Sequence, residues 1–540
     1  MVTTVQAPVG ESPAPMSHRE IMEALSGLLL GLFVTMVSST IVTNALPTIV
    51  ADLGGGESTY TWVVTSALLA TTASTPIWGK LADLMSKKLL VQLGLAIFVV
   101  GSAAAGLAQN IGELIAARTI QGVGAGGMIA LVQVIMAAMI APRERGRYSG
   151  YIGVAYAAAT VTGPLLGGVV TQTSWLGWRW CFYVGVPVAA VASVVLQRTL
   201  HLPVLKRGAG ADAGAVGRIK IDYLGAVLIS AAVSLLLVWV SLGGSVFAWA
   251  SWQTAVMVPG AIVLGALFVW TETRAAEPII PLGLFRSRTV VLSTLASGCV
   301  GVGIFGATVF LSQYFQIARG ASPTESGLLT LPMIAGMTLA SLISGRVITA
   351  TGRWKYFLVA GSAVLTVGLA LLGTARYDTG YPMLVVYMAL VGAGLGMVLQ
   401  NLVLAVQNAV PIRELGTASA TVAFFRTLGG AVGVSALGAL LSARVTGYLA
   451  DGLRTLGVPA PADSGSVPDL DTLPAPVRHV VQQAYGHATG DLFLAAAPIP
   501  LVALIAVLFL KETRLRSSNA APATEAPATE TPATVRPGGA

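Results

Sequence analysis

Charged side chains are scarce in this sequence. Asp, Glu, Lys and Arg make up 10% of its 540 residues, whereas 55% of the residues are hydrophobic. A soluble globular domain has about 25% charged residues, so this composition excludes an ordinary water-soluble protein and indicates one embedded in a lipid bilayer. The 62 glycines agree with this interpretation, because glycine lets membrane helices pack closely.

Cysteine and histidine are also rare, which limits the chemistry available to the chain. The two cysteines, Cys181 and Cys299, lie in separate apolar segments and suggest neither a disulfide framework nor a metal site. None of the four histidines lies inside an apolar run. The apolar runs hold no Cys–His, metal-ligand or Ser–His–Asp set of the kind that an enzyme needs. We therefore expect a protein that is not an enzyme and holds no metal and no cofactor.

A nucleotide-binding loop is missing as well. The pattern G-x-x-x-x-G-K-[ST] does not occur, so ATP is not expected to drive the protein directly. All 23 acidic residues lie at or outside the edges of the apolar runs. The net charge of +8 matters less than its placement along the chain. The expected partners are the lipid bilayer and a small-molecule substrate, with no nucleic acid.

Long apolar runs are what the chain has in abundance. Fourteen of them reach about 20 residues, the length of a helix that crosses the bilayer. They lie near 24–46, 60–81, 89–108, 112–136, 147–171, 180–198, 223–242, 253–271, 289–314, 325–348, 355–375, 382–406, 416–442 and 490–511. The first run is longer than a signal-peptide core, so we expect it to be retained.

The order of these runs predicts an all-α integral membrane protein with fourteen transmembrane helices. Two six-helix bundles are separated by two extra helices that have no counterpart in the rest of the chain. The expected segments are a cytoplasmic N-terminal segment 1–23, a first bundle 24–198, a linker with the two extra helices 199–288, a second bundle 289–511 and a disordered, low-complexity tail 512–540.

The basic residues predict the topology. With the N-terminus placed in the cytoplasm, 23 of the 31 Lys and Arg residues fall in cytoplasmic segments and six fall outside. Because cytoplasmic loops carry an excess of Lys and Arg, this bias predicts a multi-pass protein of the cell membrane with both termini cytoplasmic. The segment 443–489 is then an extracellular loop. The remaining two cations, Arg118 and Arg426, lie within runs.

The loop between the second and third runs holds the first candidate functional residues. Gly79 permits the close approach of two helices, and Asp83 is an acid at a membrane edge, where a carboxylate needs a partner. Lys87 and Lys88 can neutralise that acid, cap a helix end or hold the loop in the cytoplasm. We expect these four residues to act in gating.

The same loop recurs in the second half of the chain. Gly345 corresponds to Gly79, and Thr349 corresponds to Asp83, so the acid is kept in the first copy alone. Other landmarks recur in the same order: Gly122, Gly124 and Gly126 as Gly392, Gly394 and Gly396; Pro142–Gly146 as Pro411–Gly416; and Gly163 and Gly167 as Gly429 and Gly433. Duplicated parallel bundles suit a transporter whose site lies between its halves.

Arg118 opens the stretch Arg118–Gly126 inside the fourth run. An arginine at this depth is costly, so we expect it to face a cavity or a partner; the alternative is a side chain that snorkels to the membrane surface. Glu113 opens the same run but lies five residues away, on a different helix face. With Arg426, these residues are our candidates for intramembrane charge and coupling.

The fifth run contains Gly163-Pro164-Leu-Leu-Gly167-Gly168. The proline removes a helix hydrogen bond and kinks the helix, and the glycines let a neighbouring helix pack closely. Ordinary tolerance of Gly and Pro in membrane helices is the alternative interpretation. The place of this stretch, one run after Arg118, favours a conformational role.

Together these motifs resemble the major facilitator superfamily and, within it, the fourteen-span drug:proton antiporters. Gly79–Lys88 is similar to the signature between helices 2 and 3, Arg118–Gly126 to the helix 4 signature and Gly163–Gly168 to the antiporter signature of helix 5. Further similar stretches are Trp62–Ala70, Trp178–Pro187, Glu277–Phe285 and Phe425–Gly433. The resemblance implies the two-bundle fold, export rather than uptake, and the proton gradient as driving force.

The sequence departs from this family in its first run. Ser38 stands where the helix 1 pattern of the family usually carries an Asp. A proton carrier needs a group whose pKa can change as the protein moves, and a serine hydroxyl does not titrate in this range. The nearest acids are Asp83, Glu113 and Asp491, at the edges of runs. We expect coupling to use these edge acids, with Glu113 the first candidate.

Polar side chains within the runs are candidates for the wall of a substrate cavity. Thr35, Ser39 and Thr43 recur every four residues and form one helix stripe, which Ser38 extends. Packing of small residues between helices is the alternative. The remaining candidates are Gln121, Asn401, Phe424 and Phe425. An apolar cavity with a few polar groups suits amphiphilic organic molecules.

These observations predict a monomeric secondary transporter that exports drug-like amphiphilic molecules by proton antiport and alternating access. An exporter of an endogenous lipid or of a self-made antibiotic would share the fold and is the main alternative. An integral-membrane enzyme would need a catalytic set, and a receptor without transport would need neither Asp83 nor the helix 5 signature.

Overall fold

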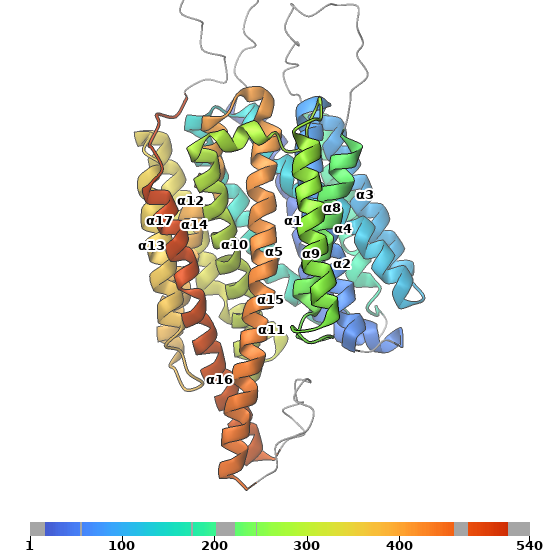
Figure 1. Ribbon diagram of the computed structural model, residues 1–540, viewed down its shortest axis with the longest axis vertical. Helices are drawn as coiled ribbons and strands as arrows, with labels where there is room; N and C mark the ends of the chain where they lie inside the picture. The colour runs from blue at the N-terminus through green and yellow to red at the C-terminus, as the bar shows by residue number, and fades with distance from the viewer. Residues whose placement is uncertain are drawn as a thin grey trace, which may run out of the picture.

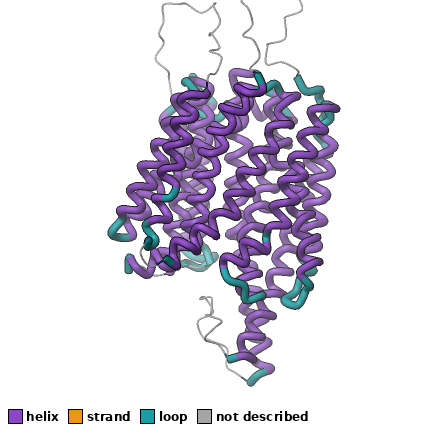
Figure 2. Tube along the Cα trace, turned by 180° about the vertical axis from the view of Figure 1, so that it is seen from behind, coloured by secondary structure: helices purple, strands orange, loops and turns teal. Residues whose placement is uncertain are grey.

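A computed structural model of the chain describes residues 17–54, 57–173, 176–200, 222–244, 246–457 and 474–516. Within these ranges the protein is almost entirely helical, with one isolated β-bridge between Gly243 and Phe247. The helices form a single bundle, seen from two sides in Figures 1 and 2. The expected tail lies outside the described residues from 517 onward, as do most of the N-terminal segment and part of the linker.

The first half of the bundle contains six helical units. The last unit is broken into two short helices. The elements are α1 (His18–Asp52), α2 (Glu57–Leu84), α3 (Lys87–Leu107), α4 (Ile111–Met139), α5 (Pro142–Gln172), and the pair α6 (Trp180–Tyr183) and α7 (Gly185–Thr199).

Two extra helices follow and lead to the second half. They are α8 (Tyr223–Leu242) and α9 (Trp252–Glu272), which we call the insert together with the segment up to η1 (Leu282–Arg286). The second half contains α10 (Arg288–Gln313) with η2 (Tyr314–Ala318), α11 (Pro323–Leu329), α12 (Leu331–Thr351), α13 (Lys355–Leu372), α14 (Tyr381–Ala409), η3 (Ile412–Glu414), α15 (Leu415–Thr455), α16 (Ala475–Ala496) and α17 (Pro498–Leu508).

Thirteen helical segments in the described ranges are long and apolar enough to cross a membrane. The remaining long helix, α2, has 28 residues and is rich in Thr and Ser. It packs against α4, α15 and α8, so protein surrounds much of this more polar helix. With α2 included, the predicted plan of two six-helix halves and two extra helices is confirmed.

Glycines at equivalent places in the two halves set the spacing of the helices. In α4, Gly122 and Gly126 lie against α2, and Gly124 lies against α3, so closely that a side chain would collide with the neighbouring backbone. In α14, Gly392 and Gly396 lie against α12 in the same way, and Gly394 lies against α13. The duplication predicted from the sequence is therefore also a duplication of helix contacts.

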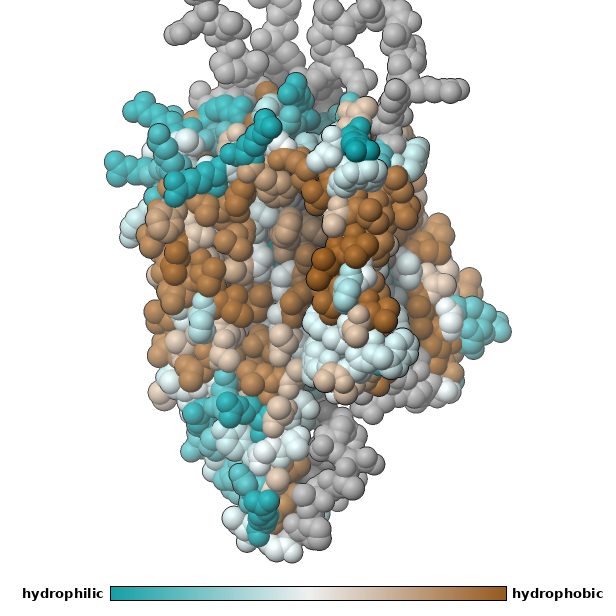
Figure 3. Space-filling model, in the orientation of Figure 1, coloured by the Kyte–Doolittle hydropathy of each residue, from teal (hydrophilic) through white to brown (hydrophobic). Residues whose placement is uncertain are grey.

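The surface shows a hydrophobic belt with hydrophilic residues at both ends (Figure 3). At one end, the upper one in Figure 1, the two described chain ends come together: the N–H of Arg143 donates to the carbonyl of Arg516, and His18 contacts Tyr148. We call this end, where Arg143 and Arg516 meet, the basic end. The belt is the surface expected against lipid.

The segment 443–489 differs from the expected loop. Helix α15 continues to Thr455 and α16 begins at Ala475, so the two helices project beyond the rest of the bundle opposite the basic end (Figure 1). Asp491 accepts a hydrogen bond from the Tyr448 hydroxyl at 2.8 Å, and Gly452 packs on Val480. These contacts between the helices explain why they continue where a loop was predicted.

Candidate functional site

The carboxylate of Asp83 binds the first turn of α15, a helix of the other half. One oxygen accepts a hydrogen bond from the Gly416 N–H, and the other accepts from the N–H and the hydroxyl of Thr417, each at 2.7 Å. The first N–H groups of a helix lack partners within it, and Glu414, which precedes α15, provides no side-chain cap. Asp83 therefore caps α15 from outside, where a negative charge is favourable.

Glycine brings the two helices close enough for this cap. A Cβ atom on Gly416 would lie 2.5 Å from Oδ1 of Asp83 and 2.5 Å from the carbonyl oxygen of Gly79. A Cβ atom on Gly79 would lie 2.9 Å from the Gly416 carbonyl and would collide with Ala420. The approach of α2 to α15 thus requires glycine at both positions, as predicted for Gly79.

The repeated loop makes the matching contact between α5 and α12. Gly345 and Gly146 are the repeat counterparts of the two glycines above, and a Cβ atom on either would collide with the backbone of the other. Thr349 replaces Asp83 here, and its hydroxyl donates to the Gly345 carbonyl within its own helix. The acidic cap is therefore present in one of the two related contacts.

A basic side chain supports the second contact instead. Arg143, in the first turn of α5, donates through Nε to the Thr349 carbonyl at 3.3 Å and through Nη2 to the Ala350 carbonyl at 3.5 Å. The last carbonyl groups of a helix lack partners within it, and a cation is favourable there. An acid at a helix N-terminus and a base at a helix C-terminus thus join the halves at the basic end. We call these paired contacts the gate.

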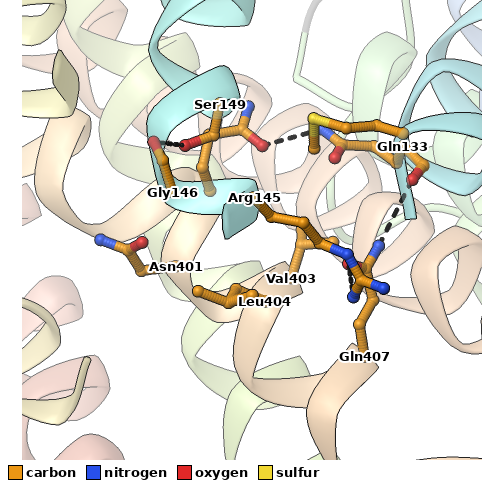
Figure 4. A pocket seen from close by; sticks show the side chains of 10 residues that line it. Gln133, Arg145, Gly146, Ser149, Asn401, Val403, Leu404 and Gln407 are labelled. Carbon is orange, nitrogen blue, oxygen red and sulfur yellow. Dashed lines mark hydrogen bonds between the residues drawn. The ribbon is translucent and has the colours of Figure 1, made fainter. Parts of the chain in front are cut away.

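A small buried cavity lies beside the gate (Figure 4). Arg145 of α5 lines it and is buried. Its guanidinium donates to the carbonyl of Ala137 at 2.7 Å, to that of Ile140 at 2.8 Å and to Oε1 of Gln407 at 3.0 Å. Because Gln407 belongs to α14, this arginine links both halves.

A second polar contact crosses the same cavity. Gln133 of α4 donates through Nε2 to Oε1 of Gln400 in α14 at 3.0 Å. Asn401, predicted for a substrate cavity, lines this one, and its amide donates to the Met397 carbonyl at 2.7 Å. Asn401 therefore lies at the closed interface between the halves.

The chain segment after α17 also reaches the gate. Arg516 donates through Nη2 to the carbonyl of Val410 at 2.7 Å and to that of Asn408 at 2.9 Å, at the C-terminal end of α14. The carbonyl of Arg516 in turn accepts from the Arg143 N–H at 3.2 Å. The sequence patterns assign Arg516 to topology and do not single out Thr417, because each acts through a partner that is distant in the chain.

Arg118 is buried inside the first half, with 3% of its surface exposed. Its Nη1 donates to Oε1 of Gln121 at 2.5 Å, and its Nε lies 3.4 Å from the Val63 carbonyl. Gln121 then donates to the hydroxyls of Ser38 at 3.0 Å and Ser102 at 2.8 Å. The arginine has polar partners at depth, as predicted, and does not snorkel.

The polar stripe of α1 does not lie on one surface. Thr35 is buried and its hydroxyl donates to the Leu32 carbonyl of its own helix, whereas Ser39 is exposed. Ser38 is buried and points to the amide of Gln121. The Thr43 side chain lies outside the described residues. Thr35 and Ser38 thus fit packing within the half, which was the alternative interpretation.

The helix 5 motif faces two neighbours. A side chain on Gly163 would collide with Thr40 of α1, and Gly168 lies close to α11 of the other half. Gly167 is buried, and the Pro164 side chain lies outside the described residues. The glycines therefore set helix spacing within the first half and across the interface.

Phe424, Phe425 and Arg426 lie on α15. Phe424 is buried in an apolar cluster that it shares with Ile279 and Ile280 of the insert, and its ring meets that of Phe425 edge-on at 5.2 Å. Arg426 is buried, and its backbone packs on Gly301 of α10. The side chain of Phe424 therefore packs α15 against the insert.

The remaining predicted residues lie at helix ends. Lys88 donates to the Gln197 carbonyl at 2.6 Å, and Lys87 is half-buried near Asp83. Glu113 is exposed, and its carboxylate accepts from the Gln109 N–H at 2.9 Å and from the Asn110 amide at 2.7 Å. Glu113 thus stabilises the start of α4 and does not approach Arg118.

In the described ranges, no group of three His, Cys, Asp or Glu residues is arranged to hold a metal.

Comparisons with known proteins agree with this architecture. The family model of the Major Facilitator Superfamily matches residues 28–242 and 221–434. An uncharacterized MFS-type transporter of Mycobacterium tuberculosis is 37% identical over 91% of this chain and 69% of its own length. The multidrug transporter protein MdtP of Bacillus subtilis is 34% identical over 86% of this chain and 80% of its own. Efflux pump dotC of Dothistroma septosporum is 31% identical, over 92% and 85%.

Solved structures share the fold. The proton:xylose symporter XylE superposes with a TM-score of 0.60 at 14% identity, over 91% of this chain and 95% of that one. The human organic anion transporter MFSD10 superposes with a TM-score of 0.59 at 14% identity, over 92% and 100%. At this identity the likeness concerns the arrangement of helices alone.

Proposed function

We propose that this chain, which belongs to the Major Facilitator Superfamily, exports drug-like amphiphilic molecules by proton antiport and alternating access. The observation that carries the proposal is the cap that Asp83 places on α15. It joins the two halves at one end by contacts that must break before that end can open. A helix-capping acid shared between halves is a means of holding one of two states.

The strength of the gate fits a reversible switch. A hydrogen bond to a charged group contributes about 1.5–3 kcal/mol. Asp83 accepts three such bonds, and the loss of hydration of its carboxylate when the basic end closes opposes most of their contribution. The net preference for the closed arrangement is then on the order of 1–3 kcal/mol, small enough for a substrate or a proton to reverse.

We place the basic end in the cytoplasm of a cell-membrane protein. The excess of Lys and Arg in the segments at this end supports that orientation. The arrangement described here is then the state closed toward the cytoplasm, from which substrate leaves outward. Opening toward the cytoplasm requires the loss of the Asp83 cap, the Gly146–Gly345 contact and the hydrogen bond between Arg145 and Gln407.

The substrate class rests on the relatives and on the lining of the bundle. Relatives named as a multidrug transporter and as an efflux pump cover most of this chain. The helices supply apolar side chains with few polar ones, which suits amphiphilic organic molecules. We take the working form to be a monomer, because the described chain contains both halves of the gate.

A drug panel tests the proposal. Cells that express the protein should accumulate less of at least one fluorescent amphiphile than cells that express Arg118→Ala, and an uncoupler should abolish the difference. Equal accumulation in both cell types would contradict drug export. A difference that survives the uncoupler would contradict proton antiport while leaving export in place.

A second candidate is export of a metabolite that the cell makes itself. It is favoured by a relative named as the Acurin A biosynthesis cluster MFS-type transporter of Aspergillus aculeatus, which is 34% identical over 74% of this chain and 71% of its own. Deletion of the gene should then deplete one native compound from the culture medium and raise it in the cells. An unchanged medium would reject this candidate.

A further inference from the structure

The insert is anchored to both halves at the basic end. Helix α8 packs against α2 and α15, the two helices joined by the acidic cap. In the segment after α9, the carboxylate of Glu277 lies 2.7 Å from Nζ of Lys80 in α2. Ile279 and Ile280 are buried in one cluster with Phe424 of α15. A change in the insert at this place therefore acts directly on the gate helices.

Two carboxylates lie close together here, and each has one oxygen that accepts a hydrogen bond and one that has no partner among the described residues. Glu272, the last residue of α9, is 4% exposed; its Oε1 accepts from the N–H groups of Ile279 at 3.0 Å and Ile280 at 3.3 Å. Asp222 caps α8 by accepting from the Gly225 N–H at 2.8 Å through Oδ1. The other oxygens, Oε2 of Glu272 and Oδ2 of Asp222, are buried without a hydrogen-bond partner among the residues that the structure describes.

The two acids converge over a glycine. A Cβ atom on Gly225 would lie 3.3 Å from Oε1 of Glu272 and would collide with Oδ2 of Asp222. The space that a side chain would fill is thus shared by the two carboxylates. Two ionised carboxylates in one buried place repel each other and lose their hydration, so one of them is favoured in its protonated form.

The charges that face Glu272 do not offset this repulsion. They are Asp222 on α8 and Lys80 on α2, and Glu277 in the segment after α9 is the ion-pair partner of Lys80. Lys80 is already paired with Glu277, so a fully ionised group has two negative charges in excess. A proton bound by one of the two carboxylates lowers this excess by one and leaves a carboxyl group that can donate to the other acid.

We propose that Glu272 and Asp222 form a proton-binding site that holds one proton between them. The shared proton lets one carboxyl group donate to the other, which gives a partner to oxygens that lack one, and it lowers the excess negative charge by one. Release of the proton restores the repulsion beside the Lys80–Glu277 pair and so perturbs α2, which carries Asp83. The role in coupling rests on the proton antiport proposed above, whereas the site itself does not.

The site can be tested without substrate. Infrared spectroscopy of the full-length protein in lipid detects protonated carboxyl groups through their C=O band during a pH titration. At neutral pH we expect a protonated band in the wild type that is lost in Glu272→Gln and, separately, in Asp222→Asn. The exposed acid Asp451 pairs with Arg454 at the far end, so Asp451→Asn should retain the band. A wild type without the band, or a band that survives both substitutions, would overturn the proposal.

A second variant tests the site without removing either carboxylate. Gly225→Ala keeps both acids but places a methyl group where their oxygens meet, so the band should titrate at a different pH while the amide bands of the helices stay unchanged. An unaltered titration in this variant would contradict a shared proton.

Export under an imposed pH gradient tests the coupling role separately. Glu272→Gln should lose the stimulation by the gradient, and Asp451→Asn should keep it. If the wild type exports nothing, the proposed function is wrong and the infrared result still stands. If the wild type exports and Glu272→Gln keeps its gradient dependence, the coupling role of this site is wrong.

Discussion

The carboxylate of Asp83 and the N–H of Gly416 lie 2.7 Å apart, although 333 positions separate them in the chain. The two residues belong to different halves, so this hydrogen bond exists only when the basic end is closed. The related contact between α5 and α12 has Thr349 in place of the acid and makes no such cap. One of the two related contacts therefore depends on a carboxylate, whereas the other is supported by the guanidinium of Arg143.

Asp83→Asn should reduce export sharply while protein levels stay near normal. The amide keeps the shape but loses the charge, and we expect a loss of about 2 kcal/mol, or an almost 30-fold shift away from the closed gate. Export rates and labelling of a cysteine at Ala420, which is buried against Gly79 in the gate, measure the effect. Glu325→Gln is the control, because glutamine also completes its capping box with Ser322. Unchanged export and labelling in Asp83→Asn would reduce Asp83 to a topology marker.

Gly146→Ala and Gly345→Ala should each hold the gate apart. The added methyl group would collide with the backbone of the facing glycine, and overpacking of this kind costs about 1–3 kcal/mol. Both variants should export more slowly and expose the cysteine probe at Ala420. Gly265→Ala is the matched control, because nothing lies within 4 Å of a Cβ atom there. Normal export by both gate variants would show that this close approach is dispensable.

Arg118→Ala should abolish export, and Arg118→Lys should restore little of it. Lysine keeps the charge but cannot bind Gln121 and the Val63 carbonyl with one planar group. Export rates should be compared with the thermal stability of each purified variant, so that misfolding is separated from loss of function. Arg454, a largely exposed arginine at the far end, provides the control substitution to alanine. Full activity of the Arg118→Ala variant would assign the buried cluster to packing alone.

Labelling of single cysteines should establish the orientation. In a background without the two native cysteines, an impermeant reagent added outside the cell should label cysteines at Ser174 and Ser466. Cysteines at Ser17 and Ser86, at the basic end, should stay unlabelled until the cells are opened. Labelling at Ser86 from outside would invert the topology and place the gate on the outer side.

Sequence reasoning identifies residues whose charge is unusual at a membrane edge or that recur in the same order in both halves. Asp83 stands out because an acid at a membrane edge needs a partner, and the glycines of α4 and α14 stand out because they recur in order. The partner of Asp83 does not follow from such reasoning, because the repeat relates Gly416 to Gly146 without stating which helices meet. Local spacing describes a helix face, whereas tertiary packing decides what that face contacts.

Two features do not follow from the sequence for this same reason. Thr35 and Ser39 share a helix face by periodicity, yet one is buried against its own half and the other is exposed. Glu272 lies one residue beyond a predicted span, where an acid in a solvated loop would be ordinary. It is buried because the chain turns back over it at Ile279 and Ile280, and this turn has no periodic signal.

Helix α15 runs without a break from the gate to the projection opposite the basic end. It runs for 41 residues, or about 60 Å, which is twice the roughly 30 Å thickness of the hydrocarbon layer. Asp83 binds one end, and the other end projects with α16 beyond the bundle (Figure 1). A tilt of about 10° would move the far tip by roughly 10 Å. With the basic end in the cytoplasm, as proposed above, a fluorescent or antibody probe on this projection would report the working cycle of the protein in intact cells, from outside and without touching the substrate path.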